Sequence, residues 1–192
     1  MISRLVNNSF KMAALPKAWK IAEVIPVPKE GNSEEPANNR PISLLPILSK
    51  VSERLAHKQF VEFLTTHDKL STYQSRNRKM HSTETALINL TDNILKAVDE
   101  KYALLLVLLD VSKAFDSLNH NLLLGKLRKL GFKASVISWF SSYLSSRYQR
   151  VGYEDSVSEL LPVTNGVPQG SILGPMLFTI YINDLISVIT HS

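Results

Sequence analysis

Apolar residues recur at helical spacing in several separate stretches of the chain. This period predicts amphipathic helices near residues 2–10, 47–64, 83–98, 120–130 and 135–146. Ser82 is a suitable N-cap for the helix at 83–98, and Gly131 is a suitable stop after the helix at 120–130. Pro175 is placed to open a last helix, because proline is favoured in the first helical turn.

Two of these helices have an apolar face that can be assigned residue by residue. In the helix at 47–64, the predicted buried face consists of Leu48, Val51, Leu55, Phe60 and Phe63. In the helix at 83–98, it consists of Ala86, Leu87, Leu90, Ile94 and Val98. Both faces are expected to pack against a common core.

The remaining regular segments are predicted to be strands or loops. Residues 22–29 alternate and contain two prolines, which favours an edge strand. Residues 102–109 (YALLLVLL) are apolar without interruption, which is typical of a central strand covered on both faces. Residues 148–162 resemble a hairpin that turns at 154–156, and residues 30–39 form a polar loop. The mixture predicts a helix-rich α+β fold with one buried strand at its centre.

Composition excludes several kinds of protein. Hydrophobic residues make up 44% of the chain and charged residues 20%, as in a globular domain. The chain has no cysteine, which excludes disulfide scaffolds, thiolate zinc sites and a cysteine nucleophile. The longest apolar run is too short to span a bilayer, and the first residues lack the apolar core of a signal peptide. The expected location is therefore intracellular, in the nucleus or the cytoplasm, without membrane contact.

The net charge of +5 is concentrated in two stretches that lack Asp and Glu, at 69–83 and 117–153. Their basic residues are Lys69, Arg76, Arg78, Lys79, Lys126, Arg128, Lys129, Lys133, Arg147 and Arg150. One interpretation is that both stretches are solvated basic faces. The other is that they form a track for a polyphosphate, whose affinity would fall steeply with salt.

Asp110 follows the apolar run directly. A carboxylate at the carboxyl end of a buried strand is well placed to be catalytic, and Mg²⁺ would compensate its charge. The alternative is a strand-end aspartate that turns the chain. Asp116 is more simply a turn or capping residue than a second acid, and Phe115 is more simply a core residue than a functional one.

The segment Gly166–Pro175 (GVPQGSILGP) is the second candidate site. Its glycines allow close approach of the backbone to a ligand, and its prolines hold the segment in one shape. Gln169 offers a donor and an acceptor at its centre. Near the first strand, Lys29 and Arg40 either clamp phosphate or coat the surface, and for each residue alone the surface role is the simpler interpretation.

Together these segments resemble one family, the reverse transcriptases of non-LTR (LINE-type, jockey-like) retrotransposons. Residues 108–116 (LLDVSKAFD) look like the first catalytic palm motif, and GVPQGSILGP, continued by YINDL at 181–185, is similar to the second. Residues 24–29 (VIPVPK) and 40–45 (RPISLL) look like fingers motifs, and residues 81–87 (HSTETAL) match the segment that follows them.

The resemblance implies a right-hand polymerase with fingers at 1–100, including the N-terminal helix, and a partial palm at 101–192, with an approximate boundary and no thumb. Its small, mostly antiparallel palm sheet would be incomplete at the C-terminus. The implied reaction is RNA-templated DNA synthesis by two-metal nucleotidyl transfer. The implied partners are an RNA template, a DNA primer and deoxynucleoside triphosphates.

The same resemblance implies roles for single residues. Asp110 would be the catalytic carboxylate and, with the Val111 carbonyl, a ligand of Mg²⁺, of which the complete enzyme holds two ions. Phe115 would be a steric gate against a 2′-hydroxyl. The triphosphate would contact Lys29 and Arg40, and the nucleotide and template would contact Gln169 and Gly170. Nucleic acid would run over Arg78, Lys126, Arg128, Arg147 and Arg150.

Departures from the family pattern leave room for other functions. The third palm motif, with two adjacent aspartates, is expected after the last helix, and the chain stops at Ser192 before it. The family's Gln-x-Gly-Phe-Arg is replaced by the sequence QSRNR at 74–78, and its following glycine by Met80. The isolated chain is therefore expected to be inactive and to bind Mg²⁺ weakly or not at all. The alternatives are a noncatalytic nucleic-acid-binding remnant of a transposable element and an inert or partner-binding α+β protein.

Overall fold

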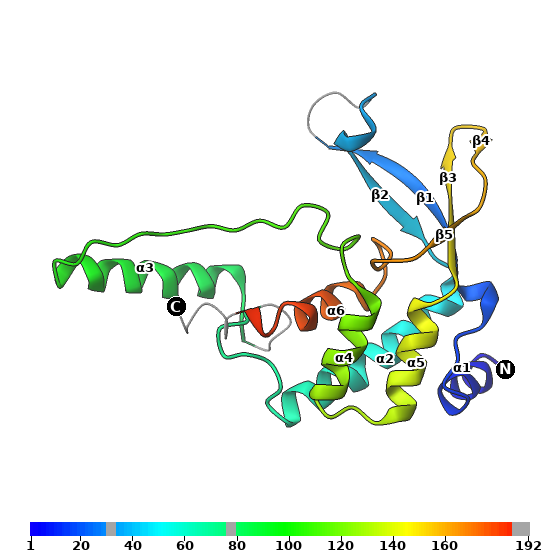
Figure 1. The fold of residues 1–192 in the computed structure, drawn as a ribbon, viewed down its shortest axis with the longest axis horizontal. Helices are drawn as coiled ribbons and strands as arrows, with labels where there is room; N and C mark the ends of the chain where they lie inside the picture. The colour runs from blue at the N-terminus through cyan, green and yellow to red at the C-terminus, as the bar shows by residue number, and fades with distance from the viewer. Residues whose placement is uncertain (30–33, 76–79, 186–192) are drawn as a thin grey trace.

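Helices and a small mixed sheet make up the fold (Figure 1), in a computed structural model that describes residues 1–29, 34–75 and 80–185. The helices are α1 (Ile2–Lys11), α2 (Ile47–Thr66), α3 (Thr83–Asp99), α4 (His120–Lys129), α5 (Ala134–Leu144) and α6 (Gly174–Tyr181), with short 3-10 helices η1 (Lys17–Trp19) and η2 (Pro36–Asn38). The strands are β1 (Ile21–Pro28), β2 (Asn39–Leu44), β3 (Arg147–Tyr153), β4 (Ser156–Val157) and β5 (Leu161–Val163). The α+β class and the predicted helices are confirmed.

The sheet has the strand order β2-β1-β3-β4, and β5 also pairs with β3. β1 is antiparallel to β2 and parallel to β3, whereas β4 and β5 are antiparallel to β3. The predicted hairpin is confirmed as β3–β4, and Glu154 in its turn has a φ of +50°. This sheet stands above the helices in Figure 1.

The prediction that the first strand lies at the edge of the sheet is wrong, because β1 lies between β2 and β3. Both prolines of β1 nevertheless lie where only one neighbour is present. The pairing with β3 ends at Val24, whereas Pro26 and Pro28 are paired with β2 alone. A residue without an N–H is tolerated there, since no ladder hydrogen bond is lost on the open side.

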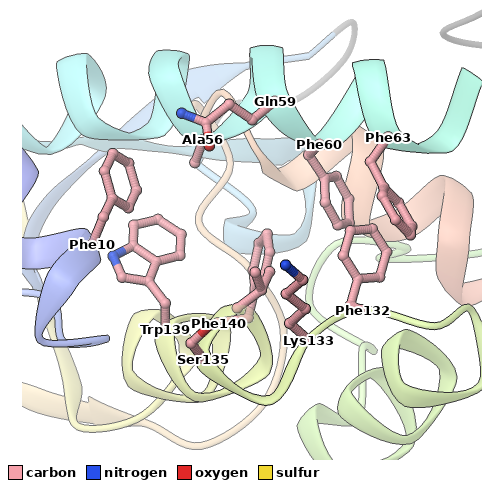
Figure 2. Close-up of a pocket in the computed structure, with 11 residues that line it drawn as sticks. Phe10, Ala56, Gln59, Phe60, Phe63, Phe132, Lys133, Ser135, Trp139 and Phe140 are labelled. Atoms are coloured by element: carbon pink, nitrogen blue, oxygen red, sulfur yellow. The ribbon is translucent and has the colours of Figure 1, made fainter. Parts of the chain in front are cut away.

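The hydrophobic core lies among α1, α2, α4, α5 and α6. Fully buried members include Leu64, Leu123, Tyr143 and Leu177. An apolar cavity of about 300 Å³ separates α2 from α1 and α5, and aromatic side chains such as Phe10, Phe60 and Trp139 form its walls (Figure 2). Aromatic rings therefore line the space between these helices.

The buried face of α2 differs from the predicted one. Val51 and Leu55 are 37% and 42% exposed, although Phe60 is buried as predicted. The buried residues are Ser49, Ser52, Glu53, Ala56, Phe60 and Leu64. Compared with the prediction, α2 is rotated about its axis, so that Ser49, Ser52 and Glu53 in its N-terminal half face the interior. Hydrogen bonds of Glu53 take the place of apolar contacts there.

The predicted helix at 83–98 is confirmed, but its predicted apolar face is not buried, since Ala86, Leu90 and Ile94 are only half-buried. Ser82 caps α3 in a capping box with Thr85, as the sequence indicates. No residue of α3 is buried, and Leu87 and Val98 are 56% and 61% exposed. Local capping and helix propensity therefore account for α3 without tertiary burial.

The prediction of a buried central strand at 102–109 is wrong. This segment is extended but belongs to no sheet, and it returns from the far end of α3 toward α4 in Figure 1. Its side chains are exposed, for example Leu105 at 87% and Leu108 at 82%. A buried central strand needs hydrogen-bonded neighbours and a layer over each face, and the described residues place neither beside this segment. Within the described ranges, no helix has the length and apolarity needed to cross a membrane.

Candidate nucleotide and nucleic-acid site

The loop between β5 and α6 lies against two other predicted site segments. Gly166 has a φ of +78°, and a Cβ at this position would come within 2.6 Å of the Phe115 carbonyl oxygen. Gly170 has a φ of +108°, and its Cβ would come within 2.9 Å of the Ser43 carbonyl oxygen in β2. Only glycine combines this backbone conformation with such close contact. The two glycines therefore bring the segment after Asp110, the loop and β2 together.

Backbone hydrogen bonds hold the loop in this place. Val167 donates to the Phe115 carbonyl oxygen at 2.8 Å, and Ser43 donates to the Gln169 carbonyl oxygen at 2.7 Å. The Nε2 atom of His120, at the start of α4, donates to the Gly166 carbonyl oxygen at 2.7 Å. The backbone of Gln169 is thus fixed against β2, while Gly170 is exposed.

A polar cavity of about 220 Å³ lies beneath this junction. Its lining comes from β1, β2, β3, β5 and the loop, and consists of Ala22, Val24, Pro41, Ser43, Asp116, Arg147, Tyr148, Gln149, Val163, Asn165, Val167, Pro168 and Gln169. Gln169 and Asp116, from the two motif segments, therefore share one cavity wall.

Lys29 and Arg40 are brought together at the outer end of the β1–β2 pair. Arg40 is paired with Val27, and the Lys29 amide donates to the Asn38 carbonyl oxygen at 2.8 Å. Residues opposite each other in an antiparallel pair share a face, so Arg40 lies on the same face as Val27. This face is open, since Val27 is 41% exposed and both cations are exposed. Because side chains alternate along β2, Ser43 lies on the other face, toward the cavity.

Asp110 is exposed to solvent, and the prediction that it ends a buried strand is wrong. It lies in the extended segment that returns from α3, and Val111 beside it is 50% exposed. The described part of the chain contains no group of three or more His, Cys, Asp or Glu side chains placed to hold a metal ion. Asp110 and the Val111 carbonyl therefore fit a magnesium ion only as part of a ligand set.

Phe115 lies half-buried at the edge of the helical core. Its ring centroid is 5.9 Å from that of Phe178 in α6, at an interplanar angle of 52°. Its carbonyl oxygen accepts from the loop, as described above. Phe115 therefore contacts both the core and the predicted nucleotide-binding loop, and the gate and core interpretations both stay open.

The residues predicted to bind nucleic acid do not form one surface. Arg128 is exposed on α4, and Arg150 is exposed on β3 with an ion pair of 3.0 Å to Glu23. Arg147 is only 2% exposed, so its prediction as a surface contact is wrong. Its guanidinium donates to the Tyr143 carbonyl oxygen at 2.8 Å and lies over the Tyr143 ring. Arg78 lies outside the described residues.

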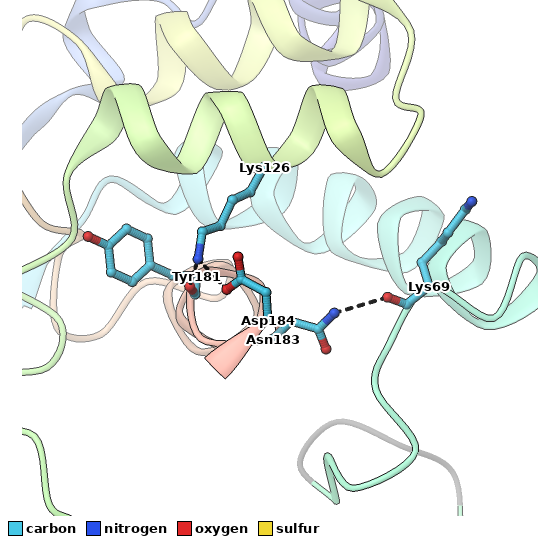
Figure 3. A network of polar contacts seen from close by, with 5 residues as sticks. All are labelled: Lys69, Lys126, Tyr181, Asn183 and Asp184. Carbon is cyan, nitrogen blue, oxygen red and sulfur yellow. Dashed lines mark hydrogen bonds and ion pairs between the residues drawn. The ribbon is translucent and has the colours of Figure 1, made fainter. Parts of the chain in front are cut away.

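Lys126 is occupied by intramolecular contacts (Figure 3). Its ammonium donates to the Tyr181 carbonyl oxygen and pairs with Asp184, just beyond α6. The Lys126 hydrogen bond holds the pKa of the Asp184 carboxyl below its usual value. Next to it, the Asn183 amide donates to the Lys69 carbonyl oxygen at 3.1 Å. Lys126 therefore links α4 to the C-terminal end of α6.

Sequence reasoning missed several residues that position the loop. Glu53 of α2 is fully buried, and its carboxylate accepts from the Ile172 amide at 2.7 Å. His120 and Ser43 were also missed. Ser49 and Glu53 lie one helical turn apart, where their side chains can form a hydrogen bond, and this spacing is the signal that could have drawn attention to Glu53.

The comparisons with known proteins agree with the resemblance. Residues 27–192 match the family described as reverse transcriptase (RNA-dependent DNA polymerase). The chain is 37% identical to a probable RNA-directed DNA polymerase from transposon BS, and 31% identical to the RNA-directed DNA polymerase from mobile element jockey, both of Drosophila melanogaster. Each alignment covers 96% of this chain and 20% of the relative, so the chain spans about a fifth of their length. On this similarity, the chain belongs to the reverse transcriptase family.

Proposed function

We propose that this chain is the fingers and partial palm of an RNA-directed DNA polymerase encoded by a non-LTR retrotransposon. The observation that carries the proposal is the junction of the loop Gly166–Pro175 with Phe115–Asp116 and β2. Three segments that resemble separate polymerase motifs meet there through glycine contacts and backbone hydrogen bonds. The division into fingers at 1–100 and palm at 101–192 is part of the proposal.

The incoming deoxynucleoside triphosphate is proposed to lie on the open face of β1–β2. Lys29 and Arg40 lie at the outer end of this strand pair and would neutralise the triphosphate, with Arg40 able to bind two phosphate oxygens at once. Val27 on the same face offers apolar surface for a base. Gly170 contacts the Ser43 backbone at the edge of β2, so the backbone of the loop can approach a nucleotide that reaches this edge.

Asp110 and the Val111 carbonyl are proposed as the ligands that this chain supplies to Mg²⁺. A magnesium ion in such a site neutralises charge on phosphate oxygens and lowers the pKa of the attacking hydroxyl. The described residues do not complete the ligand set, so no step is assigned to the ion. Phe115 is proposed as the group that excludes a 2′-hydroxyl. Template RNA and primer DNA are proposed to contact the exposed residues Arg128 and Arg150.

Primer extension by a chimera tests this proposal. Residues 1–192 would replace the aligned segment of the transposon BS relative, and DNA synthesis would be measured on an RNA template with Mg²⁺. We expect template-dependent synthesis that Asp110→Ala abolishes. Asp92→Ala, which removes an exposed carboxylate of α3, is the matched control and should leave the rate unchanged. A folded chimera that makes no DNA, or synthesis that persists in Asp110→Ala, would refute the proposal.

A further inference from the structure

Glu53 is a buried charge in the middle of the polymerase fragment, and it is not among the residues that the family motifs bring forward. Its residue exposure is 0%, and it lies in the second turn of α2. Removing a carboxylate from water is costly unless hydrogen bonds or a cation replace the lost hydration. The contacts of Glu53 therefore indicate what the buried charge does.

Those contacts tie α2 to the segment just before α6. The Glu53 Oε2 atom accepts from the amides of Ile172 and Leu173, at 2.7 and 3.4 Å. Its Oε1 atom accepts from the Ser49 hydroxyl at 3.1 Å. The Ser171 hydroxyl accepts from the Gly174 amide at 3.0 Å. The free amides at the start of α6 thus receive a carboxylate and a hydroxyl, the partners that a helix N-terminus favours.

Charged and polar groups from two other elements surround the same carboxylate. Arg147 of β3 and Tyr143 of α5 are both almost completely buried beside it. Burial raises the pKa of Glu53, although the two amides, Arg147 and Ser49 act in the opposite direction. Burial and the charge of Glu53 also raise the pKa of the Tyr143 hydroxyl. Among the described residues, the Arg147 Nη2 atom has no hydrogen-bond partner.

We propose that Glu53 is a positioning residue, which holds the loop Gly166–Pro175 in the conformation that presents Gln169 and Gly170 to the nucleotide. The Ile172 and Leu173 amides lie two and three residues after Gly170, so a shift at these amides moves the presenting residues directly. The loop is then fixed at three places: at Gly166 by Phe115 and His120, at Gln169 by β2, and at Ile172 by Glu53. The role in nucleotide presentation rests on the proposed function, whereas the anchoring of the loop does not.

Amide hydrogen exchange on the 192-residue chain tests the anchoring. In Glu53→Ala, we expect the protection of the Ile172 and Leu173 amides to fall about tenfold to a hundredfold, the factor typical of a hydrogen bond to a charged group. Glu53→Gln keeps one acceptor oxygen and should retain part of this protection. Ser52→Ala is the matched control, because Ser52 directly precedes Glu53 in α2 and its buried hydroxyl has no hydrogen-bond partner. Unchanged protection of Ile172 and Leu173 in both Glu53 variants would overturn the proposal.

The pH dependence of unfolding provides a readout that packing alone would not change. Because the folded-state pKa of Glu53 is raised, its contribution to stability is present below the unfolded pKa of about 4.3 and is lost as the pH rises through the folded value. The stability of the wild type relative to Glu53→Gln should therefore decline from pH 4 upward. A difference that does not vary with pH would overturn the assignment of a buried charge at Glu53.

Nucleotide binding separates the positioning role from the proposed function. Titration with a deoxynucleoside triphosphate and Mg²⁺ should give an affinity that Glu53→Ala weakens about tenfold and that Ser52→Ala leaves unchanged. Equal affinity in wild type and Glu53→Ala would overturn nucleotide presentation by Glu53. A wild-type chain that binds no nucleotide would count against the proposed function, and hydrogen exchange would still decide whether Glu53 anchors the loop.

Discussion

Replacing Gly166 by alanine should destabilise the chain much more than the same change at Gly131. Both glycines have positive φ, +78° and +90°, so alanine is strained at either position by about 1–2 kcal/mol. The new Cβ at Gly166 would also meet the Phe115 carbonyl oxygen and the Asp116 Cα atom at 2.6 and 2.7 Å. At Gly131 it would meet nothing within 4 Å.

The contact at Gly166 is with backbone, which cannot move aside as a flexible side chain can. Overpacking of this kind costs about 1–3 kcal/mol, so Gly166→Ala should lower the free energy of unfolding by about 2–5 kcal/mol in total. Urea unfolding measures the difference, provided that the slope with urea is the same in each variant. Gly125→Ala is a further control, because this helical position is open and alanine is the better helix former.

Equal destabilisation by Gly166→Ala and Gly131→Ala would refute the close approach of the loop to Phe115–Asp116. The strain of positive φ would then explain the whole effect. A selective loss at Gly166 would instead support the junction on which the proposed function depends.

Three further predictions concern the site. In the chimera, Phe115→Val should raise ribonucleotide incorporation if Phe115 is the steric gate. A stability loss of about 1–4 kcal/mol with unchanged sugar selectivity would show instead that Phe115 is a core residue. Binding of the chain to RNA should weaken with salt, and Arg128→Gln with Lys129→Gln should reduce the slope of log K against log salt by about two. Lys126→Met should lower stability by about 0.5–1 kcal/mol at pH 7, since its ion pair is partly exposed. This loss should shrink as the pH falls below about 4. Because the folded-state pKa of Asp184 is lowered, the pair stabilises the fold above the unfolded pKa of about 4, and this stabilisation is lost as the carboxyl becomes protonated.

The salt prediction has a matched control. Lys96→Gln removes an exposed cation of α3, outside the predicted track, and should leave the salt slope unchanged. RNA binding that ignores salt would contradict a phosphate-contacting surface. A stability loss in Lys126→Met that is the same at pH 3 and pH 7 would contradict the pairing of Lys126 with Asp184.

Features that depend on local chemistry could be predicted from the sequence. Ser82 caps α3, the chain turns at Gly131 with positive φ, and Pro175 lies in the first turn of α6. Each depends on neighbouring residues only, so one sequence contains the whole signal. The close approach of the backbone at Gly166 and Gly170 was predicted for the same reason.

Features that depend on distant partners could not be predicted in this way. Glu53 and Ile172 are 119 positions apart, and the burial of Arg147 depends on Tyr143 and on the packing of α2 and α5 around it. A basic residue in an acid-free stretch looks like a surface residue until its partners are known. The prediction of a buried strand at 102–109 was wrong for a related reason. An apolar run indicates which surface can be buried, whereas strand pairing requires a neighbour that the run itself does not specify.

The most direct test of the nucleotide site is an NMR titration of the isotope-labelled chain with a deoxynucleoside triphosphate and Mg²⁺. We expect amide shifts at Lys29, Val27 and Arg40 on the open face of β1–β2 and at Gly170 in the loop. The apolar cavity around Phe60 and Trp139 should show no change. Shifts confined to that cavity, or no saturable shift at β1–β2 and Gly170, would contradict the claim that these segments form one nucleotide site.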